Sequence, residues 1–428
     1  MRTQKTLITL LFAAVLASCT TSKKTANALS EDFVKENFSH AATMLNGQLK
    51  VANEKFEVKN GAFPRTADKN GKLVTTSMYD WTPGFFPGSL WYAYEYSKDE
   101  ALKAEAVKWT EKLLPLQHFT EHHDLGFMMY CSYGNAYRLA NKPEYKNILI
   151  NSAKALSTRF NETAGCIKSW NRFVSWHENA TYYFPVIIDN MMNLEMLFFA
   201  SRVSGDETFR KIAIKHAETT MQNHFRPDYS SYHVVCYDSA TGKVMARETA
   251  QGYADNSTWS RGQAWAVYGY TMVYRETKDP RFLKFACGLA DYFINNKNMP
   301  ADGIPYWDFN ANEAGYTPGG KSNANNIKIK YRDASAAAIT TSALLELSTY
   351  TKGKDSEKYK NAAVKMLQSL GSDTYRAKPG TNADFILKHS VGSIPHDNEI
   401  DVPLVYADYY FLEALLRYER LAKGQSLF

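Results

Sequence analysis

Two stretches of this 428-residue chain echo each other: HDLGFMMY at residues 123–130 and IDNMMNLE at residues 188–195. In each stretch one aspartate, Asp124 or Asp189, opens a long and nearly all-apolar run. Helices that are apolar on most faces are buried on all sides in a folded protein. The two aspartates are 65 residues apart, about the length of a helical hairpin with a generous loop. The echo therefore predicts two buried helices at matching places in a repeated unit, each beginning at a carboxylate.

The same unit recurs along the chain, and no strand-rich region stands out. An apolar, aromatic-rich run is followed by a short polar break and an amphipathic run. The apolar runs cover residues 85–97, 124–140, 189–204, 260–276, 333–351 and 401–420. The amphipathic runs begin near Asp99, Pro143, Asp206, Asp279 and Asp355, which are residue types that start helices. The later apolar runs begin 68 to 73 residues apart, far more than the roughly 34 residues of a tetratricopeptide repeat.

The sixth apolar run, residues 401–420, lacks an amphipathic run behind it, and the N-terminal segment 33–51 can supply one. Its stripe consists of Phe33, Phe38, Ala41, Ala42, Leu45 and Leu49. Twelve helices then pair as six hairpins, and the two chain ends close the ring. We expect an all-α fold, an (α/α)6 barrel with inner and outer layers, formed by a single domain over residues 31–428.

Four long connections, residues 159–188, 223–259, 296–332 and 372–400, lead into inner helices and therefore lie at one end of the barrel. They are rich in Trp, Tyr, Asn, His and Gly, and connections of this length are usually functional. The N-termini of the inner helices point at the same mouth, where their unpaired N–H groups and dipoles favour an anion. The topology predicts a pocket at this mouth and a negatively charged ligand.

The N-terminus has the pattern of an export signal. Arg2 and Lys5 precede an apolar run over residues 7–16 that is too short to span a membrane. Leu16-Ala17-Ser18-Cys19 resembles a bacterial lipobox, which implies a signal peptide over residues 1–18, lipid on Cys19 and a tether over residues 19–30. A plain signal peptide is the alternative. We expect an exported periplasmic or outer-membrane lipoprotein of a Gram-negative bacterium, in contact with the membrane only through its N-terminal lipid anchor.

Charge and cysteine usage exclude several classes of protein. Loss of Arg2 and Lys5 lowers the formal charge from +6 to +4, and the scattered basic residues do not favour a nucleic acid partner. There is no P-loop, no GxGxxG after a strand and no GxSxG elbow, so no cofactor is expected. Neighbouring side chains diverge in His122-His123-Asp124, so no metal is expected either. Cys131 and Cys287 lie in apolar helical patterns and are expected to be buried thiols.

The residues at the mouth also have structural interpretations. Asp124, Asp189, Asp333 and Asp401 all stand at starts of inner runs, where aspartate is a preferred helix cap. The tryptophans at loops or helix starts could stack on a sugar ring or belong to the core; they are Trp81, Trp170, Trp176, Trp259 and Trp307.

Six motifs in order resemble the unsaturated glucuronyl hydrolases of glycoside hydrolase family 88. They are WTPGFFPGSLW (81–91), HDLGF (123–127), IDNMMNLE (188–195), QGYADNSTWSRGQAW (251–265), RDASAAA (332–338) and DYYFLEAL (408–415). The resemblance covers essentially all of the mature chain and implies an (α/α)6 barrel. It also implies a substrate made by polysaccharide lyases, an oligosaccharide whose non-reducing uronic acid has a C4=C5 double bond.

By this resemblance, Asp189 protonates C4 and acts on the water that adds to C5, after which the hemiketal falls apart and the glycosidic bond breaks. Asp124 resembles the second essential carboxylate of the family, which contacts the unsaturated ring and helps to set the protonation state of Asp189. The physical chemistry agrees, because protonation of carbon needs an enclosed carboxylic acid, and a second carboxylate raises its pKa.

The other positions that the resemblance assigns to substrate binding are Trp81, Trp170, His233, Gln251, Arg261, Trp265, Ser390 and Ser393. Arg261 could instead cap or pair, Gln251 could be a turn residue, and Trp265 could belong to the core. Ser390 and Ser393 match a Ser-x-x-Ser segment linked to the neighbouring sugar and its sulfates. Some members have a lysine two residues later, where this chain has Pro395, and this departure weakens the expectation of sulfate binding there.

The expected substrate is an unsaturated uronyl oligosaccharide from a glycosaminoglycan such as chondroitin, hyaluronan or heparin. One alternative is the same chemistry on unsaturated rhamnogalacturonyl fragments of pectin. Another is a non-catalytic, glycan-capturing lipoprotein, which would have no need of both Asp124 and Asp189.

Overall fold

The structure, a computed structural model, describes residues 29–55, 62–177 and 180–428. The predicted signal peptide, Cys19 and most of the predicted tether lie outside the described residues.

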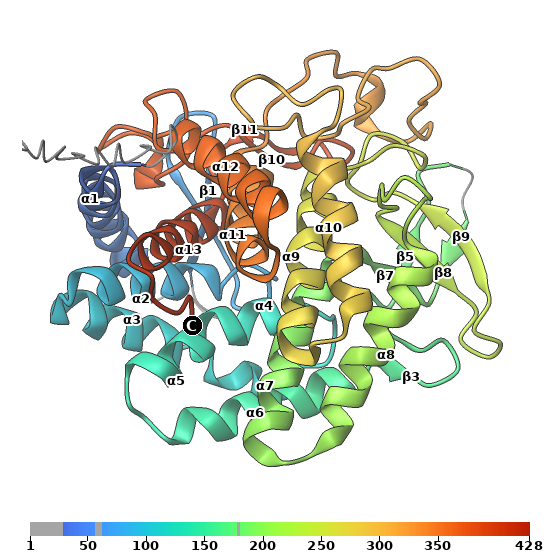
Figure 1. Cartoon of the computed structure of the whole chain (residues 1–428), viewed down its shortest axis with the longest axis horizontal. Helices are drawn as coiled ribbons and strands as arrows, with labels where there is room; N and C mark the ends of the chain where they lie inside the picture. The colour runs from blue at the N-terminus through green and yellow to red at the C-terminus, as the bar shows by residue number, and fades with distance from the viewer. Residues whose placement is uncertain (1–28, 56–61, 178–179) are drawn as a thin grey trace, which may run out of the picture.

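Twelve helical segments form two concentric layers in the described part of the chain (Figure 1). The inner layer consists of α2 (Phe85–Ser97), α4 (Leu125–Met129) continued through a π-helical turn (Tyr130–Gly134) into α5 (Asn135–Leu139), α7 (Leu194–Ser204), α9 (Ser260–Thr277), α11 (Ala334–Tyr350) and α13 (Val405–Ala422). The outer layer consists of α3 (Glu100–Glu111), α6 (Glu144–Ser157), α8 (Glu207–Asn223), α10 (Pro280–Ile294), α12 (Gly353–Leu370) and α1 (Glu31–Lys55). The predicted (α/α)6 barrel is confirmed.

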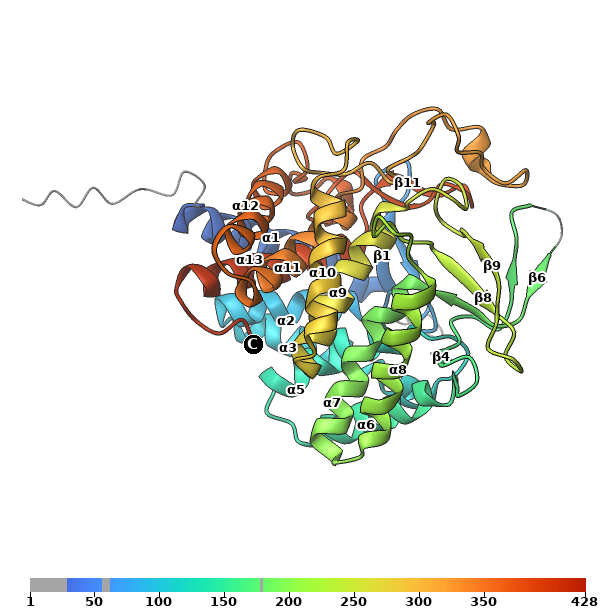
Figure 2. The ribbon, with the colours of Figure 1, turned by 45° about the vertical axis from the view of Figure 1, so that its right-hand side comes forward.

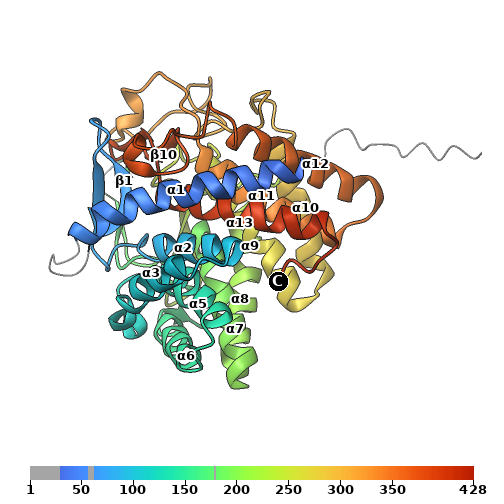
Figure 3. The ribbon, with the colours of Figure 1, turned by 90° about the vertical axis from the view of Figure 1, so that its left-hand side faces the viewer.

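The N-terminal helix closes the ring. Helix α1 contacts both α2 and α13, so the first and last hairpins lie side by side (Figure 3). Its buried stripe includes Phe38, Ala41, Leu45 and Leu49, while Phe33 and Ala42 pack on the core from its edge. Burial of this stripe against the neighbouring helices supplies the outer partner that the sixth inner helix lacks in sequence.

Most outer helices begin where the sequence predicts. The side chains of Asp99, Asp206 and Asp279 each accept a hydrogen bond from the second backbone N–H beyond, at 2.8 to 2.9 Å. Helix α12 begins at Gly353, near Asp355 as predicted, but Lys352 and not Asp355 precedes it, so Asp355 is not its cap. Asp355 lies inside the first turn, where its charge is favourable toward the helix dipole.

The inner helices differ from one another at their starts. Asp333 caps α11 by accepting from the N–H groups of Ser335 and Ala336, at 3.1 and 3.4 Å. The expectation for Asp401 is wrong: it lies in β11, its carboxylate contacts the His389 ring at 2.7 Å, and α13 begins only at Val405. Asp124 precedes α4 and Asp189 lies in a 3₁₀ turn before α7, and neither carboxylate caps its helix. The capping interpretation therefore fails for the two echoed aspartates.

Short strands order the long connections, although the sequence shows no strand-rich region. They are β1 (Phe63–Ala67), β2 (Leu73–Thr76), β3 (Phe160–Asn161), β4 (Cys166–Ile167), β5 (Phe173–Val174), β6 (Thr181–Tyr182), β7 (Pro185–Ile187), β8 (Val234–Tyr237), β9 (Val244–Glu248), β10 (Ser390–Ser393) and β11 (Asn398–Val402). Among the described residues, only β7, β8 and β9 form a sheet of more than two strands; it is antiparallel and lies beside the barrel (Figure 2). This sheet ends at Ile187, directly before the turn that carries Asp189.

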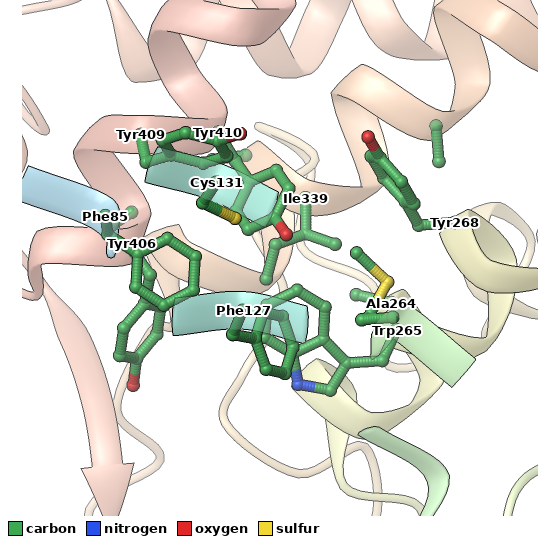
Figure 4. Close-up of a cluster of buried hydrophobic side chains, with 14 of the residues drawn as sticks. Phe85, Phe127, Cys131, Ala264, Trp265, Tyr268, Ile339, Tyr406, Tyr409 and Tyr410 are labelled. Atoms are coloured by element: carbon green, nitrogen blue, oxygen red, sulfur yellow. The ribbon is translucent and has the colours of Figure 1, made fainter. Parts of the chain in front are cut away.

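Aromatic side chains fill the barrel between the inner helices (Figure 4). Phe85 of α2, Phe127 of α4, Trp265 of α9 and Tyr410 of α13 are all buried and in mutual ring contact. Deeper in the barrel, Arg275 and Arg417 pair with Glu346 at 3.0 and 3.1 Å. These buried charges are compensated within the protein, as a stable core requires.

The cysteines of the described residues, Cys131, Cys166, Cys236 and Cys287, are free thiols. Cys131 is buried as predicted, whereas Cys287 is only half-buried. None of the helices in the described ranges has both the length and the apolar character needed to cross a membrane.

Candidate active site

The two echoed runs are held together by one close contact. A Cβ atom at Gly126 would lie 2.5 Å from the Cα atom of Asn193, so only glycine fits where α4 passes the turn before α7. The backbone N–H of Phe127 donates to Oδ1 of Asn193 at 3.0 Å. This contact fixes the starts of the two inner helices relative to each other, and with them Asp124 and Asp189.

Asp189 is enclosed, and only 7% of its surface is exposed. Burial raises the pKa of Asp189 to about 7, and the negative charge of Asp124 adds to the rise. Arg261 and the Trp265 indole act in the opposite direction, but they do not cancel the effect of burial. A substantial fraction of Asp189 is therefore protonated near neutral pH, as a general acid requires.

Asp124 is equally buried but has polar partners. Nε2 of His123 lies 3.3 Å from one carboxylate oxygen, and Nδ1 of His122 lies 3.1 Å from the other. Burial opposes ionisation of Asp124, but the imidazoles of His123 and His122 and the Arg159 guanidinium hold its pKa below the usual value. Two carboxyl groups with pKa values displaced in opposite directions are typical of an acid and its ionised partner.

His233 approaches Asp189 as a neutral donor. Its Nδ1 accepts hydrogen bonds from the N–H groups of Ala250 and Gln251, both at 3.1 Å. That nitrogen therefore has no proton, and the proton of the neutral ring lies on Nε2, 3.6 Å from Oδ2 of Asp189. Burial lowers the pKa of His233 well below its usual value, so the ring stays neutral and presents an N–H group.

Aromatic rings surround this acid pair. Trp170 lies edge-on to His233, with ring centroids 6.5 Å apart. Trp81 is half-buried and contacts Phe127 and Tyr406, at 5.6 and 4.8 Å between centroids. Trp170 is linked to Asp189 through His233, and Trp81 to Trp265 through Phe127. Such aromatic surface suits the face of a sugar.

Trp265 belongs both to the core and to the site. It is fully buried and packs on Phe127 and Tyr410. Its indole nitrogen points away from Tyr409 and Tyr410, on the side of the cluster where the Tyr406 hydroxyl lies (Figure 4). That N–H has no hydrogen-bond partner among the described residues, and it lies close enough to Asp189 to lower its pKa.

Arg261 is held by protein groups on three sides. It donates to the carbonyl of Val391, to the carbonyl of Gly392 at 2.7 Å and to Asp333 at 3.3 Å. Its guanidinium also lies over the Trp259 ring, 4.5 Å from the centroid. Arg261 thus ties β10 to α9 and α11, which is the pairing role considered from the sequence.

The two serines of β10 have different surroundings. The hydroxyl of Ser390 is fully buried and accepts from the N–H of Ser335, so it supports the start of α11. Ser393 lies at 2.6 Å from Nδ1 of His396, and His396 lines a cavity together with Trp170 and Gln251. Ser393 therefore contacts a residue that lines this cavity, whereas Ser390 supports a helix start.

Sequence reasoning missed several residues around these groups. His123 holds Asp124, and Arg172 and Lys321 line the cavity beside Gln251. Their common signal is a place in or next to a long connection, which does not reveal where each side chain points. Within the described ranges, no three His, Cys, Asp or Glu side chains gather as a metal ion would require.

Comparison with known proteins gives a consistent result. The profile of Glycosyl Hydrolase Family 88 matches residues 57–276. An unsaturated glucuronyl hydrolase of Formosa agariphila is 46% identical over 363 residues, which is 84% of this chain and 85% of that protein. An unsaturated chondroitin disaccharide hydrolase of Streptococcus pyogenes serotype M1 is 32% identical over 91% of this chain and 93% of its own length.

Solved structures agree with these relatives. The crystal structure of an unsaturated glucuronyl hydrolase specific for heparin superposes with a TM-score of 0.82 at 46% identity and covers 92% of this chain and 99% of its own. The unsaturated glucuronyl hydrolase of Streptococcus agalactiae superposes with a TM-score of 0.80 at 31% identity and covers 94% of each chain.

Proposed function

The chain belongs to glycoside hydrolase family 88 and is a hydrolase of unsaturated uronic acid oligosaccharides, and from this premise we propose that Asp189 is its proton donor and Asp124 the ionised partner. The observation that carries this assignment is the contrast in surroundings: imidazole nitrogens of His122 and His123 lie 3.1 and 3.3 Å from the Asp124 carboxylate, whereas Asp189 is enclosed and faces His233 at 3.6 Å. Burial raises the pKa of Asp189 to about 7, whereas the histidines beside Asp124 outweigh burial and keep its pKa low. Of the two groups, only Asp189 retains a proton to deliver near neutral pH.

The proposed reaction is hydration of the C4=C5 double bond. Asp189 gives its proton to C4, and the cation that forms at C5 is stabilised by the ring oxygen. Water adds to C5 and loses a proton to the Asp189 carboxylate, which restores the acid. The resulting hemiketal opens to a ketone, the linkage at C1 is released, and the products are a 4-deoxy-5-keto uronate and a shortened sugar. Because C1 is not attacked, the distance between the two carboxylates does not predict retention or inversion.

Two N–H groups support binding of a negatively charged uronate in this site. His233 Nε2 and Trp265 Nε1 are both buried and have no hydrogen-bond partner among the described residues. Buried donors rarely stay unpaired, and both lie close to Asp189. Arg261 is close enough to Asp189 and His233 to lower the pKa of both, and so adds a positive charge near the site while bonded to its protein partners.

We propose that the substrates are lyase products of glycosaminoglycans. One relative is named for chondroitin disaccharide and one solved structure for heparin specificity, and both polymers give an unsaturated uronate joined to an amino sugar. The test is a panel of unsaturated disaccharides, because the conjugated double bond absorbs in the ultraviolet and hydration removes the band. Loss of the band is expected with the wild type and not with Asp189→Asn. A wild type inert on glycosaminoglycan disaccharides but active on pectin fragments would favour the rhamnogalacturonyl alternative, and inertness on all would favour glycan capture.

We also propose that Cys19 is lipidated and anchors the enzyme to a membrane. The support is the Leu16–Cys19 sequence followed by a polar segment. In a bacterial host, the wild type is expected in the detergent phase of a Triton X-114 extract, and Cys19→Ala in the aqueous phase. Equal partitioning of the two proteins would contradict the anchor.

A further inference from the structure

His122 contacts the acid pair through Asp124 and is held in place from its other side. Nε2 of the His122 ring lies 3.1 Å from the backbone carbonyl of Tyr79. A carbonyl oxygen can only accept a hydrogen bond, so Nε2 carries a proton. The ring also packs edge-on against Phe119, with centroids 4.7 Å apart. These two contacts fix the ring and leave its Nδ1 atom to face Asp124.

Nδ1 of His122 has a partner on Asp124 in either protonation state of the ring. The backbone N–H of Asp124 donates to Nδ1 at 3.3 Å, which suits a neutral ring whose Nδ1 accepts. The carboxylate oxygen Oδ2 of Asp124 lies 3.1 Å from the same nitrogen, which suits a charged ring whose Nδ1 donates. The ring can therefore gain or lose this proton while it keeps its position.

The surroundings of His122 favour its charged form. Burial lowers the pKa of His122, but the hydrogen bond with Asp124 and the negative charge of that residue outweigh burial and raise the pKa above its usual value. Histidine is the side chain that ordinarily titrates near neutral pH, where Asp189 titrates as well. The charged and titratable groups that act on His122 are Asp124, His123 and Arg159.

We propose that His122 is a positioning residue that adjusts the acid pair to pH. With a proton on Nδ1, His122 pairs with Asp124 and compensates the negative charge of its carboxylate. Without that proton, Nδ1 accepts from the Asp124 backbone, and the full charge of Asp124 acts on Asp189. Asp189 then holds its own proton more firmly. The inference rests on the proposed function and adds a residue that widens the pH range over which Asp189 remains an acid.

The first test measures the coupling between His122 and Asp124 without catalysis. The Cε1–H signals of the 10 histidines are followed by NMR as the pH is varied, and the signal of His122 is the one absent from His122→Gln. The pKa of His122 is expected to be lower in Asp124→Asn than in the wild type by about one unit or more, because the ring loses its anionic partner. Equal pKa values in the two proteins would overturn the inference.

The second test is the pH profile of kcat/KM on an unsaturated disaccharide. His122→Gln keeps a polar side chain of similar size and removes the charge. The decline of kcat/KM toward low pH is expected to begin about one pH unit higher than in the wild type, because Asp124 takes up a proton more readily without a cation beside it. The decline toward high pH is expected to move up as well, because the charge of Asp124 then acts on Asp189 without compensation.

His118→Gln is the matched control, because His118 is an exposed histidine four residues before His122. This control is expected to reproduce the wild-type profile, and melting temperatures show whether both variants fold. A profile of His122→Gln that matches that of His118→Gln, or that moves to lower pH, would overturn the inference while leaving the acid pair intact. A wild type inert on every unsaturated uronide would overturn the proposed function and this role of His122 with it, even where NMR shows the coupling to Asp124.

Discussion

Asp189→Asn is expected to abolish activity and to stabilise the protein at alkaline pH. A carboxyl group that burial keeps protonated destabilises the folded state once it ionises, because the folded protein must then hold an anion in a poorly solvated place. The asparagine has nearly the same shape and no proton to lose. The kcat is expected to fall by a factor of about 10² to 10⁴, the contribution of a positioned general acid.

The size of the stability effect follows from the pKa of Asp189, which is about 7 in place of 3.8. Between these two values the unfolded chain is ionised while the folded protein keeps its proton, so this group makes the protein less stable as pH rises. At about 1.36 kcal/mol per pKa unit, the loss grows to about 4 kcal/mol well above pH 7. From pH 5 to pH 8 the free energy of unfolding of the wild type is expected to fall by about 2 to 3 kcal/mol through this group.

The assay is urea unfolding of both proteins at pH 5 and pH 8, followed by tryptophan fluorescence and extrapolated to zero urea. The difference between variant and wild type at each pH cancels the groups that titrate in both. It is expected to grow in favour of Asp189→Asn by about 2 to 3 kcal/mol from pH 5 to pH 8. A difference that stays constant across this range would refute the idea that Asp189 is held protonated by burial, and a fully active variant would refute its role as the acid.

Asp408 provides a matched control. It is also buried, burial raises its pKa to about 8, and it accepts from the N–H groups of Ile386 and Leu387 rather than facing His233. Asp408→Asn is expected to retain the chemistry that Asp189→Asn loses, but to lower stability, because the amide NH₂ of asparagine would face one of these two backbone N–H groups.

Three further changes test the surroundings of the acid. Asp124→Asn removes a charge that raises the pKa of Asp189, so the decline of kcat/KM with rising pH is expected to begin at lower pH; an unchanged profile would contradict electrostatic coupling of the pair. Arg261→Gln removes the cation that lowers the pKa of Asp189, so the decline of kcat/KM is expected to begin at higher pH. The value of kcat/KM is also expected to fall, because β10 loses its bonds to Arg261. A pH profile that moves to lower pH would count against this arrangement. Gly126→Ala places a Cβ atom 2.5 Å from Cα of Asn193. Differential scanning calorimetry is expected to show that the free energy of unfolding falls by about 1 to 3 kcal/mol. Gly71→Ala meets no atom within 4 Å but has a positive φ, so it reports the effect of backbone strain without a clash.

The barrel itself could be predicted because its signal is periodic. Six apolar runs and their amphipathic partners repeat with helical spacing, and burial of one stripe against another leaves few arrangements of twelve helices. Even the closing position of α1 followed from the stripe that includes Phe38 and Leu45. Helix starts were predicted well where a cap was the only role of the aspartate, as at Asp99, Asp206 and Asp279.

The same rule failed where the chain bends before a helix begins. Residues 401–402 still belong to the hairpin of β10 and β11, so Asp401 faces His389 instead of the helix that starts at Val405. The cavity beside Gln251 could not be predicted for a related reason. Its residues come from separate non-periodic connections, and the contact between Trp176 and Lys321 is a backbone hydrogen bond, which any sequence could form.

The echo between the two aspartate stretches is most informative where it breaks. The residues before Asp124 are His122 and His123, whereas those before Asp189 are Ile187 and Ile188, both buried. Because both aspartates lie in the segments that lead into adjacent inner helices, the difference in their preceding residues changes their chemistry. Imidazole partners favour the ionised form of Asp124, and the apolar approach of β7 favours the protonated form of Asp189. A repeated structural unit therefore supplies two carboxylates, and two local residues in each copy decide which one holds the proton.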